Sequence, residues 1–211
     1  MHLTVIAKAP AAGRVKTRLC PPCTPRQAAD IAEAALADTF DAIAEVVSRS
    51  DVTPVLLVDG EPPAFTPDGF EVVRQRGAGL EQRLRNGFAD LGPGVIVGMD
   101  TPQAVAGLRP AFGWLERGVD ALGLAVDGGY WAIGLSSVDD RFLAAVLDDV
   151  PMSRSHTGVH QLRRLHQLGR RVHLLPSARD LDTAGDFFAA ARAKVPGRLG
   201  AVVCAVAATL E

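Results

Sequence analysis

The sequence predicts an α/β fold with one mixed, mostly parallel β-sheet covered by helices. Short apolar runs alternate along the chain with segments whose apolar residues recur every three or four positions. At one place, two strand-like runs are too close for a crossover helix, so the sheet is expected to turn antiparallel there. With 211 residues, 48% of them hydrophobic, the chain is expected to form a single domain over residues 1–211.

Seven apolar runs have the length of strands. They cover residues 3–7, 54–59, 71–74, 95–99, 121–126, 130–135 and 172–175. Only Asp127-Gly128-Gly129 separates the runs 121–126 and 130–135, and these two form the predicted antiparallel pair.

The first long helix has a clear start signal. Thr24-Pro25-Arg26-Gln27 combines an N-cap Thr, a Pro at the first helical position and a Gln that completes a capping box. Further helical periodicity begins near residues 80, 105, 142 and 159. The apolar tail 201–210 is predicted to be a docking helix rather than a membrane anchor.

Composition excludes several classes of partner. The 22 Lys and Arg against 24 Asp and Glu leave a net charge of −2, so no overall attraction to nucleic acid or to an anionic membrane is expected. No window reaches the roughly 18 apolar residues of a membrane span. The start of the chain does not resemble a signal peptide, and three cysteines form no disulfide framework. A cytoplasmic protein is expected.

Basic residues surround the loop after the first strand. Lys8 and Lys16 are two of only three lysines in the chain, and Arg14 and Arg18 lie in the same loop. Small residues there allow backbone N–H groups to approach a ligand, so the loop is predicted to hold phosphates. Val15 precedes the Lys where a Walker A motif has Gly, and no dinucleotide fingerprint is present. A solvated basic loop is the alternative.

Acidic residues follow two other strands. Asp100 comes directly after residues 95–99, and Pro102 leaves Asp100 or Thr101 to cap the next helix. A carboxylate at this edge, facing a phosphate loop, would also suit Mg²⁺. Asp180 and Asp182 follow the last strand and can point the same way if the segment is extended. Helix capping is an alternative for Asp182, but it leaves Asp180 without a role.

The segment from Asp127 to Tyr130 has two interpretations. As a hairpin turn it needs no further function. Its two glycines, Gly128 and Gly129, also allow a ligand to lie against bare backbone beside the aromatic Tyr130.

Two other motifs are weaker. Cys20-Pro21-Pro22-Cys23 has the spacing of a redox pair but lacks the second pair that a zinc site needs. His156 and His160 have the spacing of zinc ligands on a helix, but no Glu follows His156. The histidines are expected at the surface.

Taken in order, four blocks resemble a bacterial family of uncharacterised GT-A-like proteins. That family is often labelled glycosyltransferase-like and is related to the phospholactate and molybdenum cofactor guanylyltransferases. The blocks are residues 7–19, 98–102, 127–130 and 180–183. The resemblance implies a three-layer α/β/α, Rossmann-like GT-A fold, the nucleotide-diphospho-sugar transferase fold.

The resemblance also implies a set of site residues. Nucleotide phosphates would be held by Ala7, Lys8, Gly13, Arg14, Lys16 and Arg18. Asp127, Gly128, Gly129 and Tyr130 would line the acceptor side. Asp100, Asp180 and Asp182 would bind Mg²⁺ or Mn²⁺, with Lys16 and Asp100 as the catalytic pair.

The implied activity is transfer of a nucleoside monophosphate from a nucleoside triphosphate to a phosphorylated small molecule, with release of pyrophosphate. Glycosyl transfer from a nucleotide sugar, or nucleotide binding without turnover, are the alternatives. The expected partners are the nucleotide and a small-molecule acceptor, without nucleic acid or membrane, and a homodimer is left open.

Overall fold

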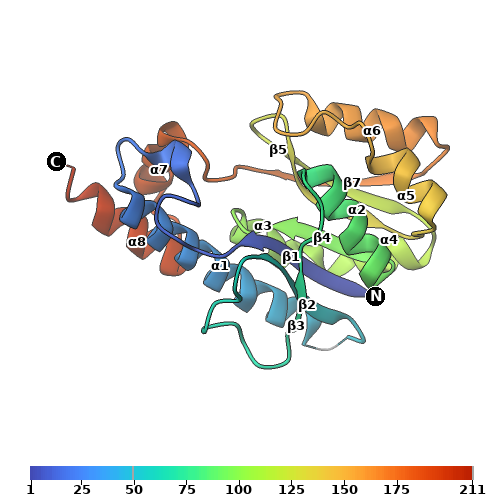
Figure 1. The fold of residues 1–211 in the computed structure, drawn as a ribbon, viewed down its shortest axis with the longest axis horizontal. Helices are drawn as coiled ribbons and strands as arrows, with labels where there is room; N and C mark the ends of the chain where they lie inside the picture. The colour runs from blue at the N-terminus through green and yellow to red at the C-terminus, as the bar shows by residue number, and fades with distance from the viewer. Residues whose placement is uncertain (49, 211) are drawn as a thin grey trace.

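The computed structural model describes residues 1–48 and 50–210. Its described strands form one sheet in the order β3-β2-β1-β4-β6-β5-β7 (Figure 1). The strands are β1 (His2–Lys8), β2 (Thr53–Asp59), β3 (Glu71–Arg74), β4 (Gly94–Gly98), β5 (Asp120–Ala125), β6 (Tyr130–Leu135) and β7 (Val172–Ala178). These ranges confirm the strands predicted from the apolar runs, with β7 extending three residues beyond its predicted end.

The sheet is parallel except at β6. This strand pairs antiparallel with both β4 and β5, whereas β1–β2, β1–β4, β2–β3 and β5–β7 are parallel pairs. The short turn at residues 127–129 therefore produces the predicted antiparallel pair. Because the other strands run in one direction, their carboxyl ends lie at one edge of the sheet.

Helices cover both faces of the sheet. The helices are α1 (Pro25–Val47), α2 (Leu80–Leu91), α3 (Pro102–Val105), α4 (Arg109–Glu116), α5 (Asp140–Leu147), α6 (Thr157–Gln167), α7 (Ala184–Ala193) and α8 (Gly197–Ala207), with short 3₁₀ turns η1 (Thr17–Leu19) and η2 (Ala106–Leu108). One core lies between the sheet and α1, α3 and α4. A second core lies between the sheet and α2, α5 and α6. The α/β/α layering is confirmed.

The predicted helix near residue 105 is instead three short pieces. Pro110 lies in the first turn of α4, where its missing N–H costs nothing, but it could not continue a helix from Val105 without losing a backbone hydrogen bond. The chain therefore ends α3 at Val105 and restarts at Arg109.

A third apolar cluster joins the two ends of the chain. The Thr24 capping box is present, with Thr24 Oγ1 accepting from the Gln27 N–H at 3.2 Å, and it starts α1. Leu199 and Val203 of α8 are buried in a cluster with Ile31 of α1, which confirms the docking helix.

Figure 1 shows α7 and α8 at the end of the molecule away from α5 and α6. No helix in residues 1–48 and 50–210 is long and apolar enough to cross a membrane.

Candidate functional site

Two adjoining cavities open at the carboxyl edge of the sheet. The first, the basic cavity, has a volume of about 520 Å³ and is lined by residues that include Lys8, Arg14, Lys16 and Arg83. The second, the acidic cavity, has a volume of about 430 Å³ and is lined by residues that include Asp127, Arg154 and Asp180. Both cavities share a border made by Arg18, Leu80, Gly98, Asp100, Ser153 and Asp182. Together they form one cleft.

Lys16 lines the basic cavity beside this border, between two carboxylates that belong to the border. Its ammonium group contacts Asp100, and its Nζ is 3.9 Å from Asp182 Oδ1. The side chain is only 5% exposed, and the backbone has the left-handed conformation, with φ of 51°. Arg18 forms a further ion pair with Asp182. The fold thus brings together charged residues that the sequence placed in three separate blocks.

Neither carboxylate at the border is a helix cap. The N-cap of α3 is Thr101, without a side-chain capping bond. The N-cap of α7 is Thr183, which forms a capping box with Asp186. The capping alternative for Asp100 and Asp182 is therefore wrong, and both carboxylates are free to face the cleft.

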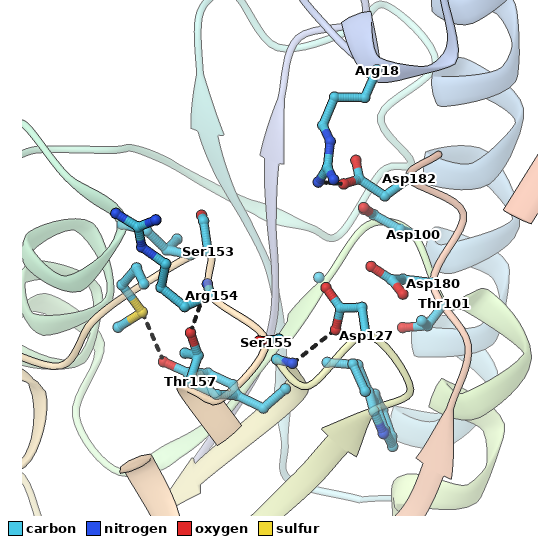
Figure 2. A pocket seen from close by; sticks show the side chains of 17 residues that line it. Arg18, Asp100, Thr101, Asp127, Ser153, Arg154, Ser155, Thr157, Asp180 and Asp182 are labelled. Carbon is cyan, nitrogen blue, oxygen red and sulfur yellow. Dashed lines mark hydrogen bonds and ion pairs between the residues drawn. The ribbon is translucent and has the colours of Figure 1, made fainter. Parts of the chain in front are cut away.

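Four carboxylates line one wall of the acidic cavity. Figure 2 shows Asp182, Asp100, Asp180 and Asp127 one after another along that wall. Burial and the neighbouring carboxylates, Asp127 first and then Asp100, raise the pKa of Asp180 to about 6, although Lys16 opposes the shift. The carboxylates of this wall are thus close enough to disfavour the ionisation of Asp180.

The predicted three-carboxylate metal centre is not preformed. Among the described residues, no group of three or more His, Cys, Asp or Glu side chains is arranged to hold a metal ion. Asp100, Asp180 and Asp182 do line the same cavity. Two of them, Asp100 and Asp182, already face the positive charge of Lys16.

The turn after β5 lies at the floor of the acidic cavity. Asp127 Oδ1 accepts from the Gly129 N–H at 2.8 Å, and Asp127, Gly129 and Tyr130 line the cavity. Gly128 does not line it. A Cβ at Gly128 would lie 1.8 Å from the Ser155 carbonyl oxygen, so the expectation that both glycines offer bare backbone to a ligand is wrong for Gly128. Its lack of a side chain serves packing.

The phosphate loop lines the basic cavity in most of its predicted positions. Ala7, Lys8, Arg14, Lys16 and Arg18 all line it. Gly13 does not, and its φ of 75° is a conformation that glycine adopts without steric cost. Gly13 therefore shapes the loop rather than facing the cavity.

Motif analysis missed a brace beside the basic cavity. Gln75 Nε2 donates to the carbonyl oxygens of Ala7 (2.8 Å) and Leu57 (2.9 Å). Arg83 donates to Gln75 Oε1 at 3.0 Å and to Asp59 Oδ2 at 2.7 Å. The hydrogen bond from Arg83 to Asp59 lowers the pKa of Asp59. No sequence motif marks these residues, because their roles depend on the ends of three neighbouring strands.

The segment before α6 was also missed as a wall of the site. Ser153 and Arg154 line the acidic cavity across from the carboxylates, and Ser155 lines it beside the turn at Gly128 (Figure 2). Ser153 has a positive φ of 57°, which a residue with a side chain rarely adopts. The segment lies between α5 and α6, and only the return of the chain over the turn after β5 brings it to the cavity.

The cysteine and histidine motifs form no site. Cys20, Cys23 and Cys204 are free thiols, and burial raises the pKa of Cys23, the opposite of an activated thiol. His156, the N-cap residue of α6, and His160, on α6, are exposed as expected, with ring centres 5.0 Å apart.

Solved structures share this fold. A protein provisionally named a nucleotide-diphospho-sugar transferase, from Desulfovibrio desulfuricans G20, is 20% identical over 100% of this chain and 97% of its own, with a TM-score of 0.80. Rv0371c from Mycobacterium tuberculosis H37Rv, solved as a complex with manganese, is 24% identical over 90% of this chain and 97% of its own, with a TM-score of 0.52. A cytidylyltransferase from Leptospira borgpetersenii serovar Hardjo-bovis (strain JB197) is 14% identical over 99% and 93%, with a TM-score of 0.54.

These likenesses establish the nucleotide-diphospho-sugar transferase fold that the resemblance implied. No curated protein matches the chain significantly. The family described as "Uncharacterized protein conserved in bacteria (DUF2064)" matches residues 42–154, more than half of the chain. That region holds Asp100 and the turn from Asp127 to Tyr130. The chain belongs to this bacterial family.

Proposed function

We propose that this chain is a nucleotidyltransferase that depends on a divalent metal. It transfers a nucleoside monophosphate from a nucleoside triphosphate to a phosphorylated small molecule and releases pyrophosphate. The observation that carries the proposal is the position of Lys16, which lines the basic cavity and contacts Asp100 at the border with the acidic cavity. The fold shared with a cytidylyltransferase is consistent with this chemistry.

The basic cavity suits the triphosphate. Lys8, Arg14 and Lys16 supply three positive charges to it, and such charges bind phosphate oxygens through strong, charge-assisted hydrogen bonds. The brace of Gln75 and Arg83 fixes the carbonyl group of Ala7 next to Lys8 and so holds the start of the phosphate loop in place. In this arrangement Lys16 neutralises the negative charge that develops on the leaving pyrophosphate.

The carboxylates at the border suit a hard divalent cation. Mg²⁺ is usually held by one or two carboxylates together with substrate phosphates, rather than by a closed protein cage. Asp100 and Asp182 form such a pair and already flank a positive charge, and Asp180 lines the same cavity. When bound, Mg²⁺ or Mn²⁺ would offset phosphate charge and polarise the reacting phosphoryl group. A manganese complex of a fold relative agrees with this assignment.

The reaction itself needs no nucleophile from the protein. An oxygen of the acceptor phosphate attacks the α-phosphorus, a new P–O bond forms, and the bond to the bridging α,β oxygen breaks. The electron pair leaves with pyrophosphate, which Lys16 and the arginines hold. The protein contributes position and charge, with the acceptor in the acidic cavity and the triphosphate in the basic one.

A ligand panel tests this function. Melting temperatures are measured with each of the four common nucleoside triphosphates and with nucleotide sugars, in Mg²⁺, Mn²⁺ or EDTA. Ligand at a hundred times its Kd stabilises a protein by about 2.7 kcal/mol, so one triphosphate is expected to raise the melting temperature only when metal is present. Incubation of that triphosphate with phosphorylated metabolites is expected to release pyrophosphate. Stabilisation by nucleotide sugars alone contradicts the proposal and favours glycosyl transfer.

A further inference from the structure

The acidic cavity has one basic side chain that is not neutralised. Arg18 and Arg154 are the basic residues that line it. Arg18 is paired with Asp182, whereas Arg154 makes no ion pair with any residue in the described part of the chain. Figure 2 shows Arg154 across the cavity from the wall of carboxylates. An uncompensated guanidinium in a cavity is a ready partner for a carboxylate or a phosphate.

The backbone of Arg154 is held from both sides. Its N–H donates to Thr157 Oγ1 at 3.0 Å, and its carbonyl oxygen accepts from the Thr157 N–H at 3.1 Å. Thr157 Oγ1 in turn donates to the Pro151 carbonyl oxygen at 2.6 Å. The next residue, Ser155, packs against Gly128. The fold therefore fixes the point from which the Arg154 side chain extends, while the side chain itself stays exposed.

The start of α6 does not offer an alternative anion site. The Thr157 N–H donates to the Arg154 carbonyl oxygen, and the Gly158 N–H donates to the Gly128 carbonyl oxygen at 2.9 Å. Those first amide groups of the helix are used within the protein. On the opposite wall, Asp127 and Asp180 repel anions. The guanidinium of Arg154 is thus the favourable position for negative charge on this side.

Arg154 is separate from the border where transfer would occur. Asp100, Asp182 and Ser153 line both cavities, but Arg154 lines the acidic cavity alone. Arg154 therefore lies on the acceptor side of the border. A ligand that fills the acidic cavity would place one group at the border and another at Arg154.

We propose that the acceptor carries a second anionic group, a carboxylate or a phosphate, and that Arg154 binds it. This inference rests on the proposed function, in which the acidic cavity takes the acceptor. Arg154 is then a specificity residue that selects small molecules with two separated negative groups. Its neighbours in sequence, Ser153 and Ser155, also line the cavity and carry hydroxyl groups that can donate hydrogen bonds.

Local binding of simple anions tests the site without knowing the acceptor. Backbone amide NMR signals of Ser153, Arg154 and Ser155 are followed as inorganic phosphate is added at constant ionic strength, and in a second series as acetate is added. The variants are Arg154→Gln and, as a matched control, Arg163→Gln. Arg163 is an exposed arginine of α6 that does not line the cavity.

In the wild type, the three signals are expected to shift and saturate with phosphate, with acetate, or with both, and the active probe identifies the class of anion. Arg154→Gln is expected to weaken this binding at least about tenfold because a charge-assisted contact is lost. Arg163→Gln keeps the wild-type affinity. Equal affinity in Arg154→Gln, or no saturable shift with either anion, overturns the inference.

Signals from residues 14–17, which line the basic cavity alone, report separately on phosphate bound there and are expected to respond equally in Arg154→Gln. The test is thus distinct from that of the proposed function. Anion binding at Arg154 in a protein that binds no nucleoside triphosphate would remove the transferase assignment but leave the anion site.

Discussion

The Lys16 ammonium group contacts the Asp100 carboxylate across 84 positions of sequence. The contact joins the loop after β1 to the loop after β4, the two neighbouring parallel strands at the centre of the sheet. A buried positive charge therefore sits beside the carboxylates of Asp100 and Asp182, at the border of the two cavities.

Replacing Lys16 with Met is expected to reduce nucleoside triphosphate affinity at least about tenfold, because one phosphate-binding charge is lost. The same change leaves Asp100 without its ion-pair partner and Asp182 with Arg18 alone, so the melting temperature without ligand is expected to fall. Isothermal titration calorimetry and melting curves measure the two effects. Lys194→Met is the control, since Lys194 also has a positive φ, of 48°, but is exposed at the end of α7. Unchanged affinity in Lys16→Met would remove Lys16 from the site.

Asp100→Asn distinguishes a metal ligand from a structural residue. Thr101, not residue 100, is the N-cap of α3. The effect of Asp100→Asn therefore does not depend on how well Asn caps a helix. Stabilisation by nucleoside triphosphate with Mg²⁺ or Mn²⁺ is expected to fall strongly. Stability in EDTA is also expected to fall, because the buried Lys16 loses its charged partner, so the quantity compared is the stabilisation that metal and nucleotide add. The control is Asp139→Asn, at the N-cap of α5, where Asn caps about as well as Asp. The measurement is a melting curve of each protein with and without metal and nucleotide, and equal metal-dependent stabilisation in all three excludes Asp100 as a ligand.

Gly128→Ala is expected to be far more destabilising than a glycine substitution at a similar backbone angle. Gly128 has a φ of 91°, and a Cβ there would lie 1.8 Å from the Ser155 carbonyl oxygen. Gly118 has a φ of 70° with nothing within 4 Å, so Gly118→Ala is expected to cost only the backbone strain, about 1 to 2 kcal/mol. Urea denaturation compares the two free energies of unfolding. Similar values would show that the turn after β5 can shift away from Ser155 and make room for the added methyl group.

His2 is expected to make the protein sensitive to acid. Burial lowers the pKa of His2 from 6.5 to about 4, and the ring contacts Thr4 Oγ1 (2.7 Å) and the Gly92 carbonyl oxygen (3.0 Å). The unfolded chain therefore binds the proton first. The stability contributed by the neutral ring is complete above pH 6.5 and is lost as the pH falls towards 4, by roughly 3 kcal/mol.

Urea denaturation at pH 7.5 and 4.5, for the wild type and for His2→Gln, measures this contribution. Glutamine does not titrate, so the variant is expected to lose less stability between the two pH values. The carboxylates contribute to both proteins alike and cancel in the comparison. Equal losses would show that His2 does not titrate as its burial requires.

Most of the sheet could be predicted from the sequence, because buried strands need apolar runs and the antiparallel pair needs a short turn. The capping box at Thr24 and the docking of α8 followed from local patterns too. The helix near residue 105 was predicted less well, since Pro110 interrupts it without changing its apolar spacing. The alternative of helix capping for Asp100 and Asp182 was wrong as well. Aspartate often caps helices, but the adjacent Thr101 and Thr183 are the N-cap residues here.

The sequence by itself determined the fold class and identified the basic loop and the carboxylates that follow β4 and β7, because these depend on residues close together in the chain. Only the tertiary structure decided how they meet. The burial of Lys16 against Asp100, the brace from Gln75 and Arg83, and the position of Arg154 all join segments that are distant in sequence. Local patterns carry no record of such contacts, since they arise from the order of strands in the sheet. The packing of Gly128 against Ser155 has the same origin, and it gives a turn glycine a role in packing rather than in lining the cavity.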